Sequence, residues 1–117
     1  MTLNEVIAAL ALEVIHLEDG ERRVEDGYCG DLLSWVMGRA AENSMWITIM
    51  SNLNTVAVAV MADVAAVVMA EGVEAEDDVI RRAEQQGVNL LRSNESAFVL
   101  AGRLYSLLKE REHDPEV

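Results

Sequence analysis

Apolar and polar positions repeat with two different periods along this chain, and changes of period mark the predicted elements. Residues 2–10 start with Thr2 and Glu5 in the spacing of a capping box and continue with apolar residues at helical spacing, which predicts a helix. Residues 13–17 alternate between apolar and polar, which predicts a strand, and residues 23–28 predict a second one. A turn-like acidic segment separates these two strands, so they resemble a hairpin.

The middle of the chain predicts two internal strands. A helix over residues 31–40, capped by Asp31, precedes the strand at residues 45–50, which is apolar on both faces. A short helix capped by Asn54 or Thr55 then leads to a second internal strand at residues 64–69. Periodicity alone is also compatible with one long helix over residues 55–69. We prefer the split because Asp63 interrupts the run and β-branched residues follow it.

The C-terminal third continues the alternation of helices and strands. A helix ends at Gly87, and a short strand covers residues 88–91. Ser93 or Asn94 caps a last helix whose buried stripe reaches Leu108 and which has Lys109 and Arg111 near its end. The expected fold class is therefore α/β, a three-layer α/β/α arrangement around a mostly parallel sheet, with a mixed sheet left open. We expect a single domain over residues 1–111 and a polar C-terminal tail over residues 112–117.

Charge and composition narrow the classes of partner. The 117 residues include 21 acidic and 9 basic ones, and this net charge of −12 argues against binding to nucleic acid or to an anionic membrane. The longest apolar stretch, residues 56–69, is too short to span a bilayer. Cys29 is the single cysteine, so no intrachain disulfide is possible, and the N-terminal residues lack a signal-peptide pattern. We expect a cytoplasmic location.

No catalytic motif stands out. The chain has no phosphate-binding loop sequence, and the pair Gly27 and Gly30 lacks the rest of a dinucleotide-binding fingerprint. Cys29 with His16 as its base is a conceivable nucleophile, but a structural thiol is the simpler interpretation. The acidic cluster at residues 71–78 is typical of a helix N-terminus. We therefore expect no enzyme activity, no metal and no cofactor.

Four segments carry a resemblance to a known family. Residues 27–37 (GYCGDLLSWVM), together with residues 46–49, 70–72 and 93–98, resemble the DRTGG domain over nearly the whole chain, from about residue 2 to residue 108. Of the family's TGG step, Gly72 is the residue kept. The resemblance implies a free-standing member with a fold similar to the N-terminal domain of HPr kinase. It also implies a regulatory or interaction module that is usually dimeric and has no established catalysis.

Short polar residues follow the predicted parallel strands, where ligands bind in open α/β sheets. Helix N-termini at these positions can bind anions through free N–H groups, although a role as helix caps alone is equally compatible. The candidate ligand-binding residues are Tyr28, Asp31, Ser51, Asn52, Asn54, Thr55, Gly72, Ser93, Asn94 and Ser96.

Large apolar side chains suggest a second kind of surface. Trp35, Trp46 and Met50 are the candidate interface residues, and a homodimer is the expected use of such a surface, with core packing as the alternative. The sequence thus favours a non-enzymatic regulatory or interaction module that homodimerises and binds an unknown protein partner. The alternative is a sensor domain for a small ligand of the nucleotide type.

Overall fold

Five strands form one mixed sheet in the order β1-β5-β4-β3-β2. The computed structural model describes residues 1–112, so the expected tail lies outside the described residues except for Glu112, which belongs to the last helix. The strands are β1 (Glu13–His16), β2 (Asp26–Cys29), β3 (Ser44–Thr48), β4 (Ala66–Met69) and β5 (Leu90–Arg92). The helices are α1 (Leu3–Leu10), α2 (Leu33–Arg39), α3 (Leu53–Ala62), α4 (Asp77–Gln86) and α5 (Ala97–Glu112).

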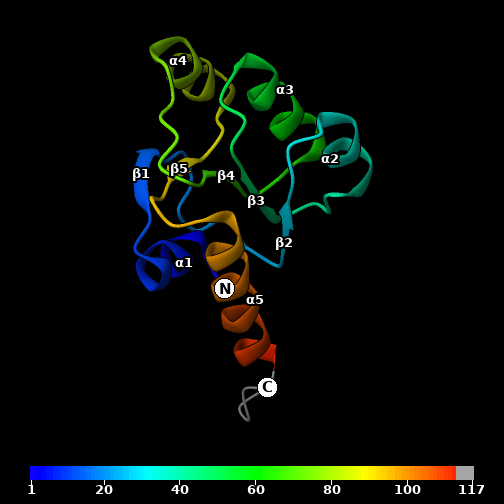
Figure 1. The fold of residues 1–117 in the computed structure, drawn as a ribbon, viewed down its shortest axis with the longest axis vertical. Helices are drawn as coiled ribbons and strands as arrows, with labels where there is room; N and C mark the ends of the chain where they lie inside the picture. The colour runs from blue at the N-terminus through cyan, green and yellow to red at the C-terminus, as the bar shows by residue number, and fades with distance from the viewer. Residues whose placement is uncertain (113–117) are drawn as a thin grey trace.

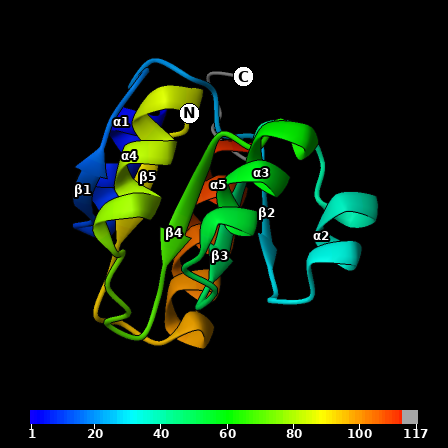
Figure 2. The same cartoon turned by 90° about the horizontal axis from the view of Figure 1, so that it is seen from above.

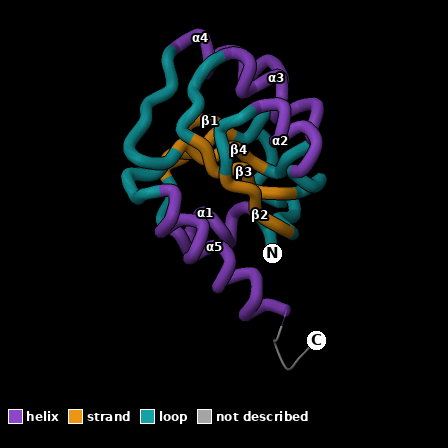
Figure 3. Tube along the Cα trace, turned by 45° about the vertical axis from the view of Figure 1, so that its right-hand side comes forward, coloured by secondary structure: helices purple, strands orange, loops and turns teal. Residues whose placement is uncertain are grey.

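The helices cover both faces of this sheet. Helices α2, α3 and α4 lie on one face, whereas α1 and α5 lie on the other (Figures 1 and 3). Each face has its own apolar core, with Leu100 and Leu104 of α5 in one and Val56 of α3 and Val79 of α4 in the other. The predicted three-layer α/β/α class is confirmed.

Strand direction confirms part of the predicted topology. Strands β2, β3, β4 and β5 are mutually parallel, while β1 is antiparallel to β5. The predicted hairpin of the first two strands is wrong, because β1 and β2 lie at opposite edges of the sheet (Figure 2). The intervening segment is held against the N-terminus instead of turning back: Leu3 N donates to Arg22 O at 2.8 Å, and Asn4 N donates to Gly20 O at 2.9 Å.

The two internal strands are placed as predicted. Every residue of β3 and β4 is buried, which accounts for their lack of polar alternation. Asp63 ends α3 in the left-handed conformation at φ 54°, so the apolar run is divided between a helix and a strand. Asn and Asp adopt this conformation at lower cost than most residues with a Cβ.

Trp46 belongs to the core and not to a surface. Its side chain is 0% exposed, and the indole Nε1 donates to Gly30 O at 2.9 Å. The expectation that Trp46 lines an interface is therefore corrected: α3 covers one face of β3, and the indole fills the core beneath it.

Candidate functional site

The loops that follow β3, β4 and β5 meet at one end of the sheet. Gly72 N donates to Ser93 O at 3.0 Å, and Glu71 N donates to Glu95 O at 2.8 Å. Ser51 Oγ donates to Glu74 O at 3.3 Å. Three of the predicted ligand-binding segments are thus brought together, as expected for parallel strands.

Polar side chains that follow β3 form the hydrogen bonds at the N-terminus of α3. Asn52 Oδ1 accepts from Asn54 N at 2.9 Å and from Thr55 N at 3.1 Å, so Asn52 is the N-cap. The prediction of Asn54 or Thr55 as cap is wrong by two or three residues, because the Asn52 side chain reaches the free N–H groups first. Thr55 is buried, and its Oγ1 donates to Met50 O at 3.1 Å. Asn54 is exposed.

The loop after β5 is ordered by its own hydroxyls. Ser93 Oγ accepts from Glu95 N at 3.1 Å, and Ser96 Oγ accepts from Val99 N at 3.2 Å. The latter bond has the geometry of an N-cap, which moves the cap of α5 from Ser93 or Asn94 to Ser96. Asn94 is exposed and lies beside Gly72, where an added Cβ would come within 3.2 Å of Asn94 Oδ1.

Asp31 ties two strand ends together and does not cap α2. Its Oδ1 accepts from Thr48 Oγ1 at 2.7 Å and from Ile49 N at 2.9 Å. The N-cap of α2 is Leu32, without a side-chain hydrogen bond. The prediction that Asp31 caps α2 is therefore wrong, because its carboxylate accepts hydrogen bonds from donors at the end of β3.

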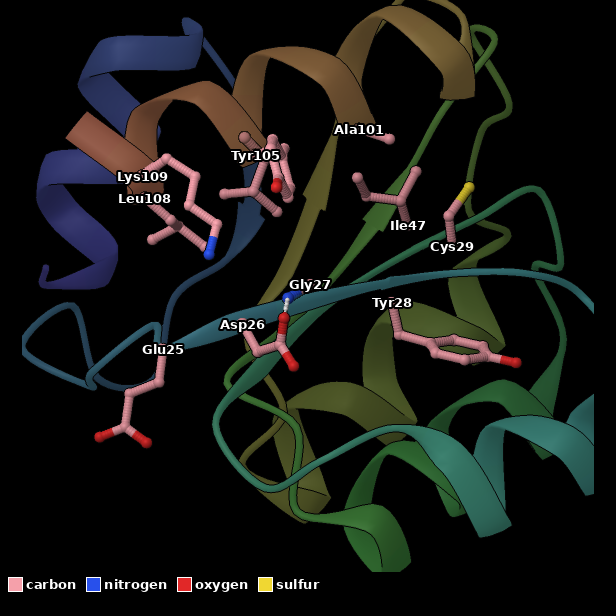
Figure 4. A pocket seen from close by; sticks show the side chains of 11 residues that line it. Glu25, Asp26, Gly27, Tyr28, Cys29, Ile47, Ala101, Tyr105, Leu108 and Lys109 are labelled. Atoms are coloured by element: carbon pink, nitrogen blue, oxygen red, sulfur yellow. Dashed lines mark hydrogen bonds between the residues drawn. The ribbon is translucent and has the colours of Figure 1, made fainter. Parts of the chain in front are cut away.

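Tyr28 is half-buried on the sheet face that carries α2 and α3. It packs against the apolar cluster of that face, and its ring points away from α5 in Figure 4. Strands β3 and β4 lie between the strand of Tyr28 and β5, so Tyr28 is apart from the loop that follows β5.

A hollow of about 240 Å³ lies where β5 ends and α5 begins, and we call it the β5-end hollow. It contains two of the predicted residues, Ser93 and Asn94, and two arginines that the sequence analysis did not single out. Its lining residues are Leu10, Ala11, Glu13, Arg92, Ser93, Asn94, Glu95 and Arg103.

The two arginines differ in their partners. Arg92 is structural: it donates to Gly72 O at 2.9 Å, to Val73 O at 3.0 Å and to Glu13 Oε2 at 2.7 Å. These bonds join the loop after β4 to β5 and β1. Removing the Arg92 guanidinium would leave several main-chain and carboxylate acceptors without their partner.

Arg103 is held mainly by a carboxylate. Its Nη1 lies 2.8 Å and 2.7 Å from the two carboxylate oxygens of Glu95, and Nη2 donates to Ala9 O at 3.1 Å. Both side chains of this pair are partly exposed. A guanidinium held by one exchangeable carboxylate is also a suitable group for binding a phosphate.

The hypothetical pair of Cys29 and His16 is not assembled. Cys29 ends β2 and His16 ends β1, at opposite edges of the sheet, and His16 Nε2 lies 3.0 Å from Glu18 Oε2 instead. Within residues 1–112, no group of three or more His, Cys, Asp or Glu side chains is placed to hold a metal ion. No helix in this part of the chain is long and apolar enough to cross a membrane.

Cys29 is expected to alkylate slowly although it is exposed. Desolvation raises the pKa of its thiol, and the nearby charge of Asp31 raises it further. A raised pKa leaves less thiolate at any given pH, and the thiolate is the reactive form. The iodoacetamide reaction followed by mass spectrometry from pH 7 to pH 9 should be slower than for the same chain unfolded in urea. Equal rates in the folded and unfolded chain would contradict this account.

A second cavity, of about 250 Å³, lies between β2 and α5, and we call it the β2–α5 cavity. Ile47 and Leu104 form apolar walls, Tyr105 and Leu108 border it from α5, and Glu25 and Asp26 border it from the β2 side (Figure 4). The sequence pattern did not predict this cavity. Gly27 was its one signal, since a Cβ there would lie 2.8 Å from Leu104 Cδ2.

The three proposed interface residues lie in three different environments. Trp35 on α2 is 53% exposed and stacks beneath Arg39, whose guanidinium carbon lies 4.0 Å from the ring centroid. Met50 is half-buried and Trp46 is in the core. A homodimer through this surface stays a prediction, now with Trp35 as its main exposed residue.

Comparison with known proteins identifies a structural neighbour. No family model matches the sequence, and no curated protein matches it. The fold is similar to the solved CBS and DRTGG domains of the regulatory region of Clostridium perfringens pyrophosphatase, complexed with the activator diadenosine tetraphosphate. The TM-score is 0.69 at 11% sequence identity, over 88% of this chain. This chain spans 45% of the length of that one, and the likeness is one of fold.

Proposed function

We propose that this chain is a non-enzymatic regulatory domain of the DRTGG type that binds a small nucleotide-type ligand at the β5-end hollow. The observation that carries the proposal is the Arg103–Glu95 pair, at 2.7 Å, beside the exposed amide of Asn94. The similarity to a regulatory region complexed with a dinucleotide activator supports the same class of ligand.

The β5-end hollow suits the phosphate end of such a ligand. Its volume of about 240 Å³ is smaller than the roughly 300–1,000 Å³ of typical small-molecule pockets. Only the phosphate end of the ligand would therefore enter the hollow. The base would lie outside it, over the loops after β3 and β5, where the side chains of Ser51 and Asn94 can form hydrogen bonds with it. Mg²⁺ would reduce the repulsion between a nucleotide and a chain of net charge −12.

Binding would proceed by exchange at Arg103. A phosphate takes the place of the Glu95 carboxylate and accepts from Nη1 of the guanidinium, while Nη2 keeps its bond to Ala9 O. Glu95 also accepts a main-chain bond from Glu71 in the loop after β4. Movement of Glu95 would therefore reach the β4 loop, which provides a route from ligand binding to a change elsewhere on the surface.

Titration calorimetry with AMP, ATP and diadenosine tetraphosphate, each with Mg²⁺, tests the proposal. Arg103→Gln should weaken binding about tenfold, because it removes the charged donor that holds the phosphate. Glu95→Gln should strengthen binding by roughly threefold, because it removes the competing charge. A binding nucleotide at about 100 times its Kd should also add about 2.7 kcal/mol to the free energy of unfolding.

Arg82→Gln is the matched control. Arg82 is exposed on α4, in the layer on the other side of the sheet, so its loss should leave the affinity unchanged. No binding by any of the three nucleotides would overturn the proposal. Equal weakening by Arg82→Gln and Arg103→Gln would overturn the location of the site.

A further inference from the structure

Strand β2 is an edge of the sheet and is open to solvent. It pairs with β3 on one side and has no strand on the other among the described residues. Asp26, Gly27 and Cys29 are exposed, while α5 packs over one face of this strand. Gly30 N donates to Ile47 O at 3.1 Å, and by the alternation of a parallel ladder the main-chain groups of Gly27 and Cys29 face outward. Of these groups, Gly27 N donates to Asp26 Oδ1 at 2.8 Å.

The β2–α5 cavity opens beside this edge. Figure 4 shows Tyr105 and Leu108 descending from α5 toward the strand, with Ile47 and the Cys29 sulfur on the inner side. Tyr105 is 65% exposed and supplies an aromatic face at the mouth. An apolar hollow with an exposed aromatic ring at its mouth is suited to a side chain with an apolar stem and a cationic end.

The charge around the cavity is negative. Two exposed carboxylates, those of Glu25 and Asp26, border the cavity on the β2 side. They outnumber the single ammonium of Lys109, which lies 5.4 Å from the Tyr105 ring centroid. Asp31 follows shortly after the end of β2. This local excess of acid agrees in sign with the net charge of −12 and favours a basic partner.

We propose that the β2 edge and the β2–α5 cavity together bind an extended, basic segment of a partner protein. Its main chain adds a strand to β2, and a lysine or arginine stem enters the cavity beside Tyr105. A second copy of this chain fits less well, because pairing two β2 edges would bring Glu25, Asp26 and Asp31 of both copies together. The proposal is independent of the β5-end hollow, which lies near β1 and β5 at the opposite edge of the sheet.

Fluorescence anisotropy with synthetic peptides tests this inference on the whole chain. The probe is a labelled eight-residue peptide of alternating lysine and valine. The second peptide alternates glutamate and valine. The third keeps the lysine sequence but carries N-methyl groups on alternate residues, which removes the pairing N–H groups and leaves the charge. Only the first peptide is expected to bind.

Substitutions locate the bound peptide. The double variant Glu25→Lys and Asp26→Lys should weaken binding about tenfold, because attraction becomes repulsion. Lys109→Met should strengthen it, since it removes the cation at the mouth. The matched control is Asp78→Lys with Glu84→Lys on α4, which makes the same charge change on the opposite face and should leave affinity at the level expected from net charge alone.

Three outcomes of the peptide measurements would overturn the proposal. The first is no binding of the lysine peptide, and the second is equal binding of the N-methylated peptide, which would indicate charge attraction without strand pairing. The third is equal weakening by the two double variants. Sedimentation that showed a dimer dissociated by Glu25→Lys and Asp26→Lys would assign the same edge to a second copy instead.

Discussion

Replacing Trp46 with alanine is expected to lower the free energy of unfolding by roughly 3–5 kcal/mol. The side chain lies in the middle of β3, and none of its surface is exposed. Its removal leaves a cavity beneath α3 and takes the donor away from Gly30 O, at the turn that ends β2. Urea unfolding followed by far-UV circular dichroism measures the loss.

Trp35 provides the matched control, because it is the other tryptophan in the chain. It is 53% exposed and contacts the Arg39 guanidinium. Trp35→Ala should cost about 1 kcal/mol or less, since it removes a surface cation–π contact and little buried area. Similar losses for the two variants would contradict the assignment of Trp46 to the core and Trp35 to the surface.

The burial of Trp46 also shows where sequence patterns stop being informative. Residues 45–50 predict a strand covered on two sides, and that prediction is confirmed for residues 45–48, while Ile49 and Met50 follow the strand. The same segment contains a tryptophan and two methionines, which suggested a partner surface as well. A large apolar residue in a doubly covered strand faces one of two cores, so its strand assignment already argued against a surface role.

The placement of the first two strands depended on contacts that no local pattern contains. The acidic segment after residue 17 is typical of a tight turn, yet it forms part of a long connection held by the N-terminal residues. Sequence spacing fixes neither which edge β1 joins nor its antiparallel pairing with β5, whose residues lie more than 70 positions away. Strand order at the edges therefore depends on contacts between residues that lie far apart in the sequence.

The candidate site also combines features that the sequence predicts with features that it does not. The meeting of the loops after β3, β4 and β5 follows from parallel strands, and the sequence predicts it. The role of Arg92 does not follow from the sequence, because its partner Glu13 lies 79 positions away. Arg103 binds Glu95 only 8 positions away, but its other partner, Ala9 O, lies 94 positions away. Helix caps shifted by two or three residues because Asn52 and Ser96 compete with their neighbours for the same free N–H groups.

Asn89 is expected to be the second most sensitive position. It is buried just before β5, and its side chain fastens the long connection between β1 and β2 to the sheet. Its Oδ1 accepts from Glu18 N at 2.7 Å and from Asp19 N at 3.0 Å, and Nδ2 donates to Ala65 O at 2.9 Å. Asn89→Leu keeps a similar volume but removes all these bonds, which should cost roughly 2–4 kcal/mol.

Asn54→Leu is the control, because it makes the same change at an exposed position in the first turn of α3. It should change stability by about 0.5 kcal/mol or less. Hydrogen exchange adds a local measurement: in Asn89→Leu, the amides of Glu18 and Asp19 should exchange faster than the loss of global stability explains, since their acceptor is gone. Exchange at these amides that only follows global unfolding would mean that the connection is held by α1 rather than by Asn89.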